Sequence, residues 1–204
     1  MAPMRVVVLV SGGGTNLQSL LDASREGALG PAEVVGVLSN RPGVRALARA
    51  AAAGVPARVI DHRGFADRAA FDAALRAEVT SLGADLVVLA GFMRVLSGAF
   101  LEGFEDRVIN IHPSLLPAFP GVRGPAQALQ HGVKVSGCTV HFVDAGLDTG
   151  AIIAQAAVPV LDDDTEASLQ ARILVEEHRL LPSVVASLAS GRLRREGRRV
   201  YRIS

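Results

Sequence analysis

Hydrophobic residues gather in short runs that alternate with stretches of helical periodicity through the first half of the chain. The apolar runs predict buried strands at residues 5–10, 33–39, 57–61 and 85–90. Between them, the spacing of apolar residues predicts helices from about Asn16, at 44–53 and at 67–81. Near-continuous apolar strands that alternate with helices are typical of βαβ units, whose helices cover both faces of a parallel sheet. The sequence therefore predicts an α/β fold with a doubly wound, mostly parallel sheet.

The pattern changes in the second half of the chain. A short helix is expected at 97–104, and two longer apolar strands at 135–144 and 151–160 are joined by the turn-rich sequence AGLDTG. Consecutive strands joined by such a turn form a hairpin, so we expect an antiparallel addition to the parallel core. A long amphipathic helix follows, with Thr165 as its N-cap and an interruption at Pro182, where the ring can kink the helix.

Composition and charge narrow the class of protein. The chain has 204 residues, 50% of them hydrophobic, and no repeat or low-complexity linker, so we expect a single domain over residues 1–204. The formal net charge of +1 offers no overall basic excess to a nucleic acid or an acidic membrane. The arginine-rich end, GRLRREGRRVYR, predicts a terminal hairpin with a charged, solvated outer face, with an RNA-binding patch as the alternative. The first apolar run is too short for a secretory signal or a membrane span, so we expect a cytoplasmic location.

The sequence offers no convincing metal site. Its single cysteine, Cys138, excludes an internal disulfide and a cluster of zinc thiolates. Three consecutive aspartates at 162–164 are interpreted as a solvated loop before the long helix and not as metal ligands. Three histidines without companions at ligand spacing are interpreted as structural, namely His62, His131 and His141.

Two polar residues interrupt the apolar strand VINIH at 108–112. Asn110 and His112 are two apart, so they point to the same face of the strand. Burying a polar group without a partner costs roughly 1 to 3 kcal/mol, so the pair must be hydrogen-bonded inside or face a cavity. Pro113 biases His112 away from the α region and keeps it at the extended end of the strand. The alternative interpretation is a satisfied core histidine.

The first strand ends in a glycine-rich loop, SGGGTN, at residues 11–16. A loop that runs from a strand into a helix can hold a phosphate on backbone N–H groups and on the positive end of the helix dipole. Leu17 replaces the last glycine of a dinucleotide fingerprint, no Walker lysine follows, and Asn40 ends the second strand in place of an acidic residue. The loop therefore predicts a site for a small phosphorylated ligand, with a tight structural turn as the alternative.

A carboxylate, Asp148, lies in the AGLDTG loop between the two long strands. This loop can reach the carboxyl edge of the sheet, where open α/β sheets bind their ligands. Asp148 would there favour the protonated form of His112, and Asn110 would offer a neutral donor beside it. Together these groups could stabilise an oxyanion. The alternative is that Asp148 only closes a local turn with its side chain.

Several motifs, in this order, resemble those of the phosphoribosylglycinamide formyltransferase family, which are folate-dependent enzymes of purine biosynthesis. They are SGGGTN, LAGFMRVLS, INIHPSLLPAFPG, VHFVDAGLDTG and the EEH of the last helix. INIHPSLLP is shared with other 10-formyltetrahydrofolate enzymes, whereas the SGGGTN loop and the compact length favour this family. The resemblance covers nearly the whole chain and implies a Rossmann-like formyltransferase fold, with a phosphate-binding N-terminal half and a folate-binding, catalytic C-terminal half.

The resemblance also implies roles for the matching residues. The implied catalytic residues are Asn110, His112 and Asp148. Those implied to bind the ribonucleotide are Gly14, Thr15, Asn16 and Glu177, the last by holding the amine of the acceptor. Those implied to bind the folate are Arg68, Met93, Arg94, Val95, Leu96 and Asn110. The implied reaction takes the formyl group from 10-formyltetrahydrofolate, a co-substrate, to glycinamide ribonucleotide without a metal, in a monomer or homodimer that binds neither nucleic acid nor membrane.

One departure from the family pattern and three alternatives accompany this interpretation. Many relatives have a histidine where this chain has Arg123, which bears on how the loop 121–124 closes over the formyl group.

A 10-formyltetrahydrofolate hydrolase shares INIHPSLLP but carries an extra N-terminal regulatory domain, for which we expect no room here. A methionyl-tRNA formyltransferase would need a further C-terminal domain. A non-catalytic nucleotide-binding module would use the glycine loop alone.

Overall fold

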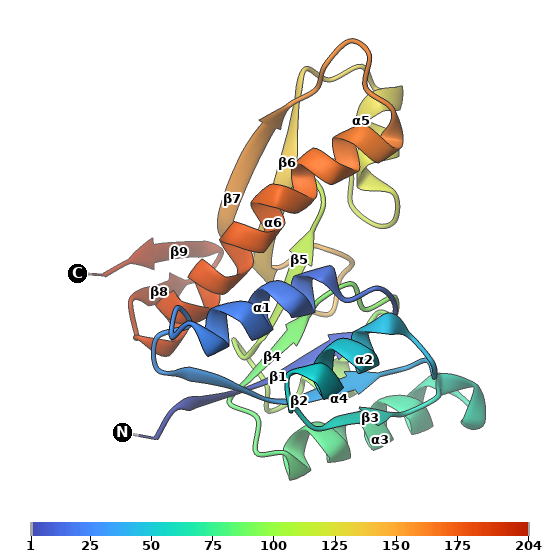
Figure 1. Cartoon of the computed structure of the whole chain (residues 1–204), viewed down its shortest axis with the longest axis vertical. Helices are drawn as coiled ribbons and strands as arrows, with labels where there is room; N and C mark the ends of the chain where they lie inside the picture. Colours follow the sequence, from blue (N-terminus) through green and yellow to red (C-terminus); the bar gives the residue numbers. More distant parts are fainter. Residues whose placement is uncertain (1, 204) are drawn as a thin grey trace.

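A seven-stranded sheet with helices on both faces forms the body of the protein in the computed structural model, which describes residues 2–203 (Figure 1). The strands are β1 (Met4–Val10), β2 (Ala32–Ser39), β3 (Ala57–Val59), β4 (Leu86–Leu89), β5 (Val108–His112), β6 (Val135–Phe142) and β7 (Ile152–Pro159). The helices are α1 (Thr15–Arg25), α2 (Arg45–Ala52), α3 (Arg68–Ser81), α4 (Gly98–Leu101), α5 (Gly124–Gln130) and α6 (Glu166–Ala189), and a short 3₁₀ turn occupies His62–Gly64.

The strand order is β3-β2-β1-β4-β5-β6-β7. Pairing is parallel from β3 to β5, whereas β6 pairs antiparallel with both β5 and β7. The chain therefore winds outward from β1 in one direction to β3 and in the other direction to β5, with crossover segments between parallel strands. This topology confirms the predicted doubly wound sheet and its antiparallel addition.

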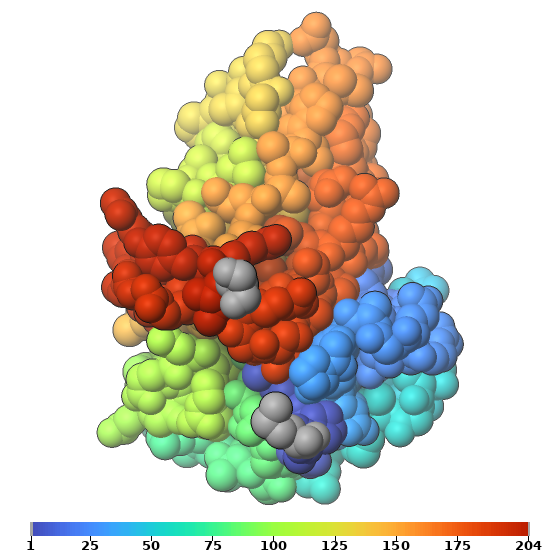
Figure 2. Space-filling model, turned by 90° about the vertical axis from the view of Figure 1, so that its left-hand side faces the viewer, coloured from blue at the N-terminus to red at the C-terminus, as the bar shows by residue number. Residues whose placement is uncertain are grey.

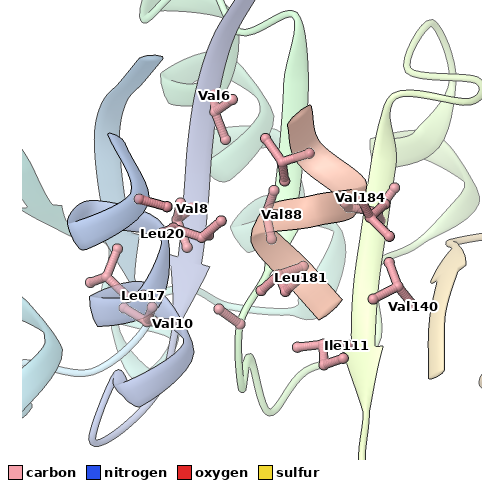
Figure 3. Close-up of a cluster of buried hydrophobic side chains, with 14 of the residues drawn as sticks. Val6, Val8, Val10, Leu17, Leu20, Val88, Ile111, Val140, Leu181 and Val184 are labelled. Carbon is pink, nitrogen blue, oxygen red and sulfur yellow. The ribbon is translucent and has the colours of Figure 1, made fainter. Parts of the chain in front are cut away.

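The two faces of the central strand β1 meet different helices. Val6 and Val8 lie on the face covered by α1 and α6, where Leu181 packs beside them (Figure 3). Val7 points to the opposite face and shares a core with Phe71 of α3. Because both faces are buried from Val6 to Val10, every position of this stretch is apolar, which explains why the sequence shows a continuous run and not an alternating one.

The long helix α6 begins where the sequence predicts it. The Thr165 hydroxyl caps it by accepting a hydrogen bond from the Ser168 amide, and the Ser168 hydroxyl oxygen accepts one from the Thr165 amide. Pro182 does not end the helix, which continues without interruption from Glu166 to Ala189. In Figure 1 the helix runs diagonally from the β6–β7 end of the molecule down to α1, so it connects both halves of the sheet. No helix in the described residues 2–203 is long and apolar enough to cross a membrane.

Three elements differ from the prediction. The strand expected at 57–61 is only Ala57–Val59 and is exposed, because β3 lies at the edge of the sheet. The helix expected at 97–104 is a single turn, Gly98–Leu101. Helix α5, Gly124–Gln130, has no counterpart among the predicted elements; its proline occupies the first turn of the helix, where the missing N–H costs nothing.

The arginine-rich end forms the predicted hairpin. Strands β8 (Leu193–Glu196) and β9 (Arg199–Arg202) pair antiparallel in a sheet of their own. Figure 2 shows this C-terminal segment lying across the middle of one face of the molecule. Arg195 anchors it by an ion pair with Asp106 and by lying 5.5 Å from the ring centroid of Phe142.

Candidate active site

The carboxyl ends of β1, β4 and β5 meet at one edge of the sheet, where a cavity of about 980 Å³ opens. Its walls come from the chain after β4, from β5, from the loop before α5, from the β6–β7 loop and from α6. The predicted site residues that line it are Asn16, Met93, Arg94, Val95, Leu96, Asn110, His112, Asp148 and Glu177. The structure thus brings together residues that are far apart in the sequence, at the edge where open α/β sheets bind ligands.

A smaller cavity of about 390 Å³ adjoins the first at the end of β1. It is lined by the glycine loop 11–16 and by Arg41, and it shares Asn16, Gly91 and Met93 with the larger cavity. A ligand that occupies both cavities would therefore span from the glycine loop to the end of β5. Arg41 supplies a positive charge beside the loop that the sequence analysis did not identify.

Gly14 explains why the loop needs glycine. Its φ is 71°, and a Cβ atom there would lie only 2.6 Å from the Cβ of Ala46. Gly14 is also the N-cap residue of α1 and has no side chain to bond the first turn of the helix. The backbone N–H groups at this helix start are therefore available to an anionic group, as a phosphate site requires.

His112 is held between two loops. Its Nε2 donates to the carbonyl oxygen of Phe119 at 2.8 Å, and its Nδ1 lies 3.4 Å from Oδ2 of Asp148. Both ring nitrogens face acceptors, an arrangement that suits the imidazolium because this form has two N–H donors. The side chain is 5% exposed, so the partners are shielded from water while the residue still lines the cavity.

Asp148 holds its charge through contacts on both carboxylate oxygens. Oδ2 accepts a hydrogen bond from the Gly121 amide at 2.7 Å, and Oδ1 lies 3.6 Å from Nε2 of His141. Burial raises the pKa of the Asp148 carboxyl, but the neighbouring His141, the hydrogen bond from the Gly121 amide and the charge of His112 outweigh it, so the pKa falls below its ordinary value. Asp148 is therefore ionised at neutral pH.

The turn of the AGLDTG loop is closed by another residue. Oδ1 of Asp144 accepts from the Gly146 amide at 3.1 Å and from the Thr149 hydroxyl at 2.6 Å. Asp148 instead reaches a residue 27 positions away. The interpretation of Asp148 as a purely local turn residue is therefore wrong.

His141 is a member of the site that the sequence analysis missed. It lines the cavity, opposite Asn110 in the antiparallel pairing of β5 and β6. Its Nε2 lies 3.1 Å from Nδ2 of Asn110, and its Nδ1 donates to the carbonyl oxygen of Phe142 at 2.8 Å. The purely structural interpretation of His141 is corrected. The signal that would have identified it is the register between the two strands, which the sequence does not display.

Glu177 is buried beside the junction of the two cavities. The side chain of Asn16 donates to Oε2 of Glu177 at 2.8 Å, and Oδ1 of Asn16 has no protein partner. Burial raises the pKa of the Glu177 carboxyl, and the bond from Asn16 offsets part of that rise. A buried carboxylate with one bond and an adjacent unpaired amide oxygen can accept donors from a ligand, such as an amine.

Glu177→Gln is expected to stabilise the protein, because the raised pKa means that ionised Glu177 costs folding free energy. The cost appears as the pH rises from the unfolded-state pKa through the higher folded-state pKa. At pH 8 the variant should melt roughly 2–4 °C higher, the shift that about 1 kcal/mol produces in a domain of this size. Calorimetry at pH 4 and pH 8 checks this, and an equal Tm at pH 8 would contradict it.

Arg68 is the one predicted folate residue that does not line either cavity described above. It lies at the start of α3, half-exposed, with Nε 3.7 Å from Oδ2 of Asp72. The segment 93–96 does line the larger cavity, with Met93 60% exposed and Leu96 buried. This segment therefore offers apolar surface to a ligand, whereas Arg68 could contact only a part of a ligand that extends beyond the cavity.

The chain belongs to the formyl transferase family, whose sequence model matches residues 4–185. Within that family it is 51% identical to the phosphoribosylglycinamide formyltransferase of Mycobacterium tuberculosis, over 98% of this chain and 94% of the relative. The similarity confirms the family resemblance drawn from the motifs.

Two further relatives extend the comparison. The crystal structure of glycinamide ribonucleotide transformylase 1 from Symbiobacterium toebii matches with a TM-score of 0.97 and 53% identity, covering 100% of this chain and 95% of that chain. The trifunctional purine biosynthetic protein adenosine-3 of Drosophila melanogaster is 55% identical over 92% of this chain. This chain spans 14% of the length of that larger protein.

Proposed function

We propose that this protein transfers the formyl group of 10-formyltetrahydrofolate to the amine of glycinamide ribonucleotide, yielding formylglycinamide ribonucleotide and tetrahydrofolate, in purine biosynthesis. The observation that carries the proposal is the meeting of Asn110, His112 and Asp148 in a cavity that adjoins the glycine loop. The names of relatives that match nearly the whole chain support the same reaction and the same pair of small-molecule substrates.

The two cavities suggest where each substrate binds. We assign the ribose phosphate to Gly14, Thr15 and Asn16, and the amine of the acceptor to the carboxylate of Glu177. The folate would bind along segment 93–96, where apolar side chains line the larger cavity, with Arg68 reserved for its glutamate tail. The amine and the formyl group would then meet beside the end of β5.

The reaction needs a donor for an oxyanion and a carrier for a proton. The amine nitrogen attacks the formyl carbon, and the carbonyl electrons move onto oxygen to form a tetrahedral oxyanion. An amide nitrogen carries two hydrogens, so Asn110 can direct one towards His141 and donate the other to this oxyanion. His112, with Asp148 as its counter-ion, adds positive charge near the same oxygen.

Collapse of the intermediate completes the transfer. The bond between the carbon and the folate nitrogen breaks, and that nitrogen takes up a proton while the former amine loses one. His112 is placed to carry this proton, because its Nδ1 faces Asp148 at the edge of the cavity. In this scheme Asn110 is the hydrogen-bond donor, His112 carries the proton, and Asp148 is the counter-ion of His112.

To test this proposal, we would measure the absorbance of the folate product after mixing the protein with 10-formyltetrahydrofolate, with and without glycinamide ribonucleotide. We expect product release that depends on the ribonucleotide. Release without it would show that water is the acceptor and would favour the hydrolase. An absence of release in both mixtures, with binding of the ribonucleotide in a calorimeter, would favour a non-catalytic module.

A further inference from the structure

The loop between β5 and α5 holds both His112 and Asp148 through its backbone. The Phe119 carbonyl accepts from His112, and the Gly121 amide donates to Asp148. The same loop has left-handed backbone at Phe119 (φ 55°), Gly121 (φ 82°) and Arg123 (φ 58°). Two of these residues are not glycine, and such a backbone persists only where the surroundings hold it in place.

Gln127 of α5 supplies that support. Its Nε2 donates to the carbonyl oxygen of Pro120 at 3.2 Å and to that of Val122 at 2.9 Å. The Pro120 carbonyl belongs to the same peptide unit as the Gly121 amide that bonds Asp148, and the Val122 carbonyl belongs to the peptide unit after Val122, so one side chain restrains the chain on both sides of Gly121. Gln127 is half-buried and lines the larger cavity.

A second contact joins the loop to α6. Arg123 donates to Glu166 with Nη2 at 2.6 Å and Nε at 3.2 Å. The two side chains are 70% and 44% exposed, so solvent screens the pair and its contribution is small. The loop is therefore restrained by Gln127 from α5 and, to a small extent, by this ion pair from α6.

We propose that Gln127 is a positioning residue for the reaction: it fixes the loop 119–123 so that the Phe119 carbonyl orients His112 and the Gly121 amide orients Asp148. The kinetic part of this inference rests on the proposed function. The geometric part does not, because Gln127, the loop and Asp148 contact one another without a substrate.

The electrostatic consequence is specific to Asp148. The titratable groups facing it are His112 from β5 and His141 from β6. Other charged groups that line the cavity are Arg94, Arg123, Asp144, Glu166 and Glu177. None of these changes when Gln127 is replaced by an uncharged residue, so a shift in the titration of Asp148 would report the loss of the Gly121 hydrogen bond.

Gln127→Met tests the proposal, with Gln130→Met as the matched control. Methionine keeps the length of the side chain and favours helix but donates no hydrogen bond, and Gln130 is an exposed residue of the same helix. Titration of the Asp148 carboxyl by ¹³C NMR, without substrate, should move to higher pH in Gln127→Met and stay at the wild-type pH in Gln130→Met. A wild-type titration of Asp148 in Gln127→Met would overturn the proposal.

Kinetics give the second readout. In Gln127→Met we expect kcat to fall about three- to tenfold, the effect of losing roughly one net hydrogen bond. The acid limb of its pH profile should move to higher pH, while KM for the ribonucleotide stays close to wild type. A uniform loss of activity at all pH values would indicate a merely structural role and would contradict the proposal.

The experiment can distinguish a failure of the proposed function from a failure of the inference about Gln127, and a second pair of variants covers the case in which Gln127→Met does not fold. If the wild-type protein transfers no formyl group, the proposed function fails, yet the NMR comparison still decides whether Gln127 positions Asp148. If Gln127→Met does not fold, as judged by circular dichroism and Tm, Gln127→Ala is compared with Gln130→Ala in the same measurements. This pair adds no charge at either position, so a difference in the Asp148 titration reports the loss of the hydrogen bonds that Gln127 donates to the loop.

Discussion

Asp148→Asn is expected to lower the turnover of formyl transfer by about 10²- to 10⁴-fold, within the range found when a proton carrier loses its function or its counter-ion. The amide keeps the shape of the side chain but cannot offer His112 a negative charge at 3.4 Å. It also offers the Gly121 amide a weaker acceptor. Steady-state kinetics at saturating substrates measure the loss, and retained wild-type turnover would remove Asp148 from the proposed mechanism.

Asp163→Asn is the matched control for this change. Asp163 is exposed on the loop before α6, so the control alters the net charge equally without touching the cavity. We expect its turnover to equal that of the wild type. A comparable loss in the control would assign the effect of Asp148→Asn to overall charge.

Asp148→Asn should also change the stability of the folded protein. The folded-state pKa of Asp148 lies below its ordinary value of 3.8, so the ionised carboxylate stabilises the folded protein above that pH. This contribution is lost as the pH falls through the lower, folded-state pKa. The wild type should therefore be more stable than Asp148→Asn at pH 7, and denaturant titrations should show the difference shrinking on acidification.

The fold could be predicted because its strands are buried on both faces. The apolar stretches 6–10 and 86–90 have no room for a polar residue, since helices cover each side of the sheet. This same rule made Asn110 and His112 conspicuous, because a polar pair on one face of a strand needs a partner or a cavity. The edge strand β3 has a neighbouring strand on one side only, and there the structure has a short, exposed strand where the sequence predicts a buried one.

The rest of the site depends on contacts that no local pattern records. His141 joins it through the register of β6 against β5, and Arg41 through the proximity of the β2 end to the glycine loop. Gln127 lies on a helix whose start GP is typical of a turn. Reactive or ligand-binding residues that interrupt an apolar strand or form a glycine loop can be recognised in the sequence. The residues that hold them in place cannot, because tertiary packing determines which residues those are.

The Asn110 side chain allows a stringent test of oxyanion stabilisation. Asn110→Ala should lower kcat by roughly a hundredfold or more, because loss of one oxyanion donor costs about 2.7 to 4 kcal/mol. KM should change little, since the hydrogen bond to the oxygen strengthens only when charge develops on it. Rapid-quench measurements of a single turnover, which isolate the chemical step, check the expectation.

Asn110→Asp provides the stricter comparison at the same position. Aspartate matches asparagine in shape but donates no hydrogen bond when ionised, and its charge would repel the oxyanion. We therefore expect Asn110→Asp to be slower than Asn110→Ala, although its side chain fills the site beside His141 better. If the side chain served only to pack against β6, the order would reverse, because aspartate would preserve the packing that alanine removes.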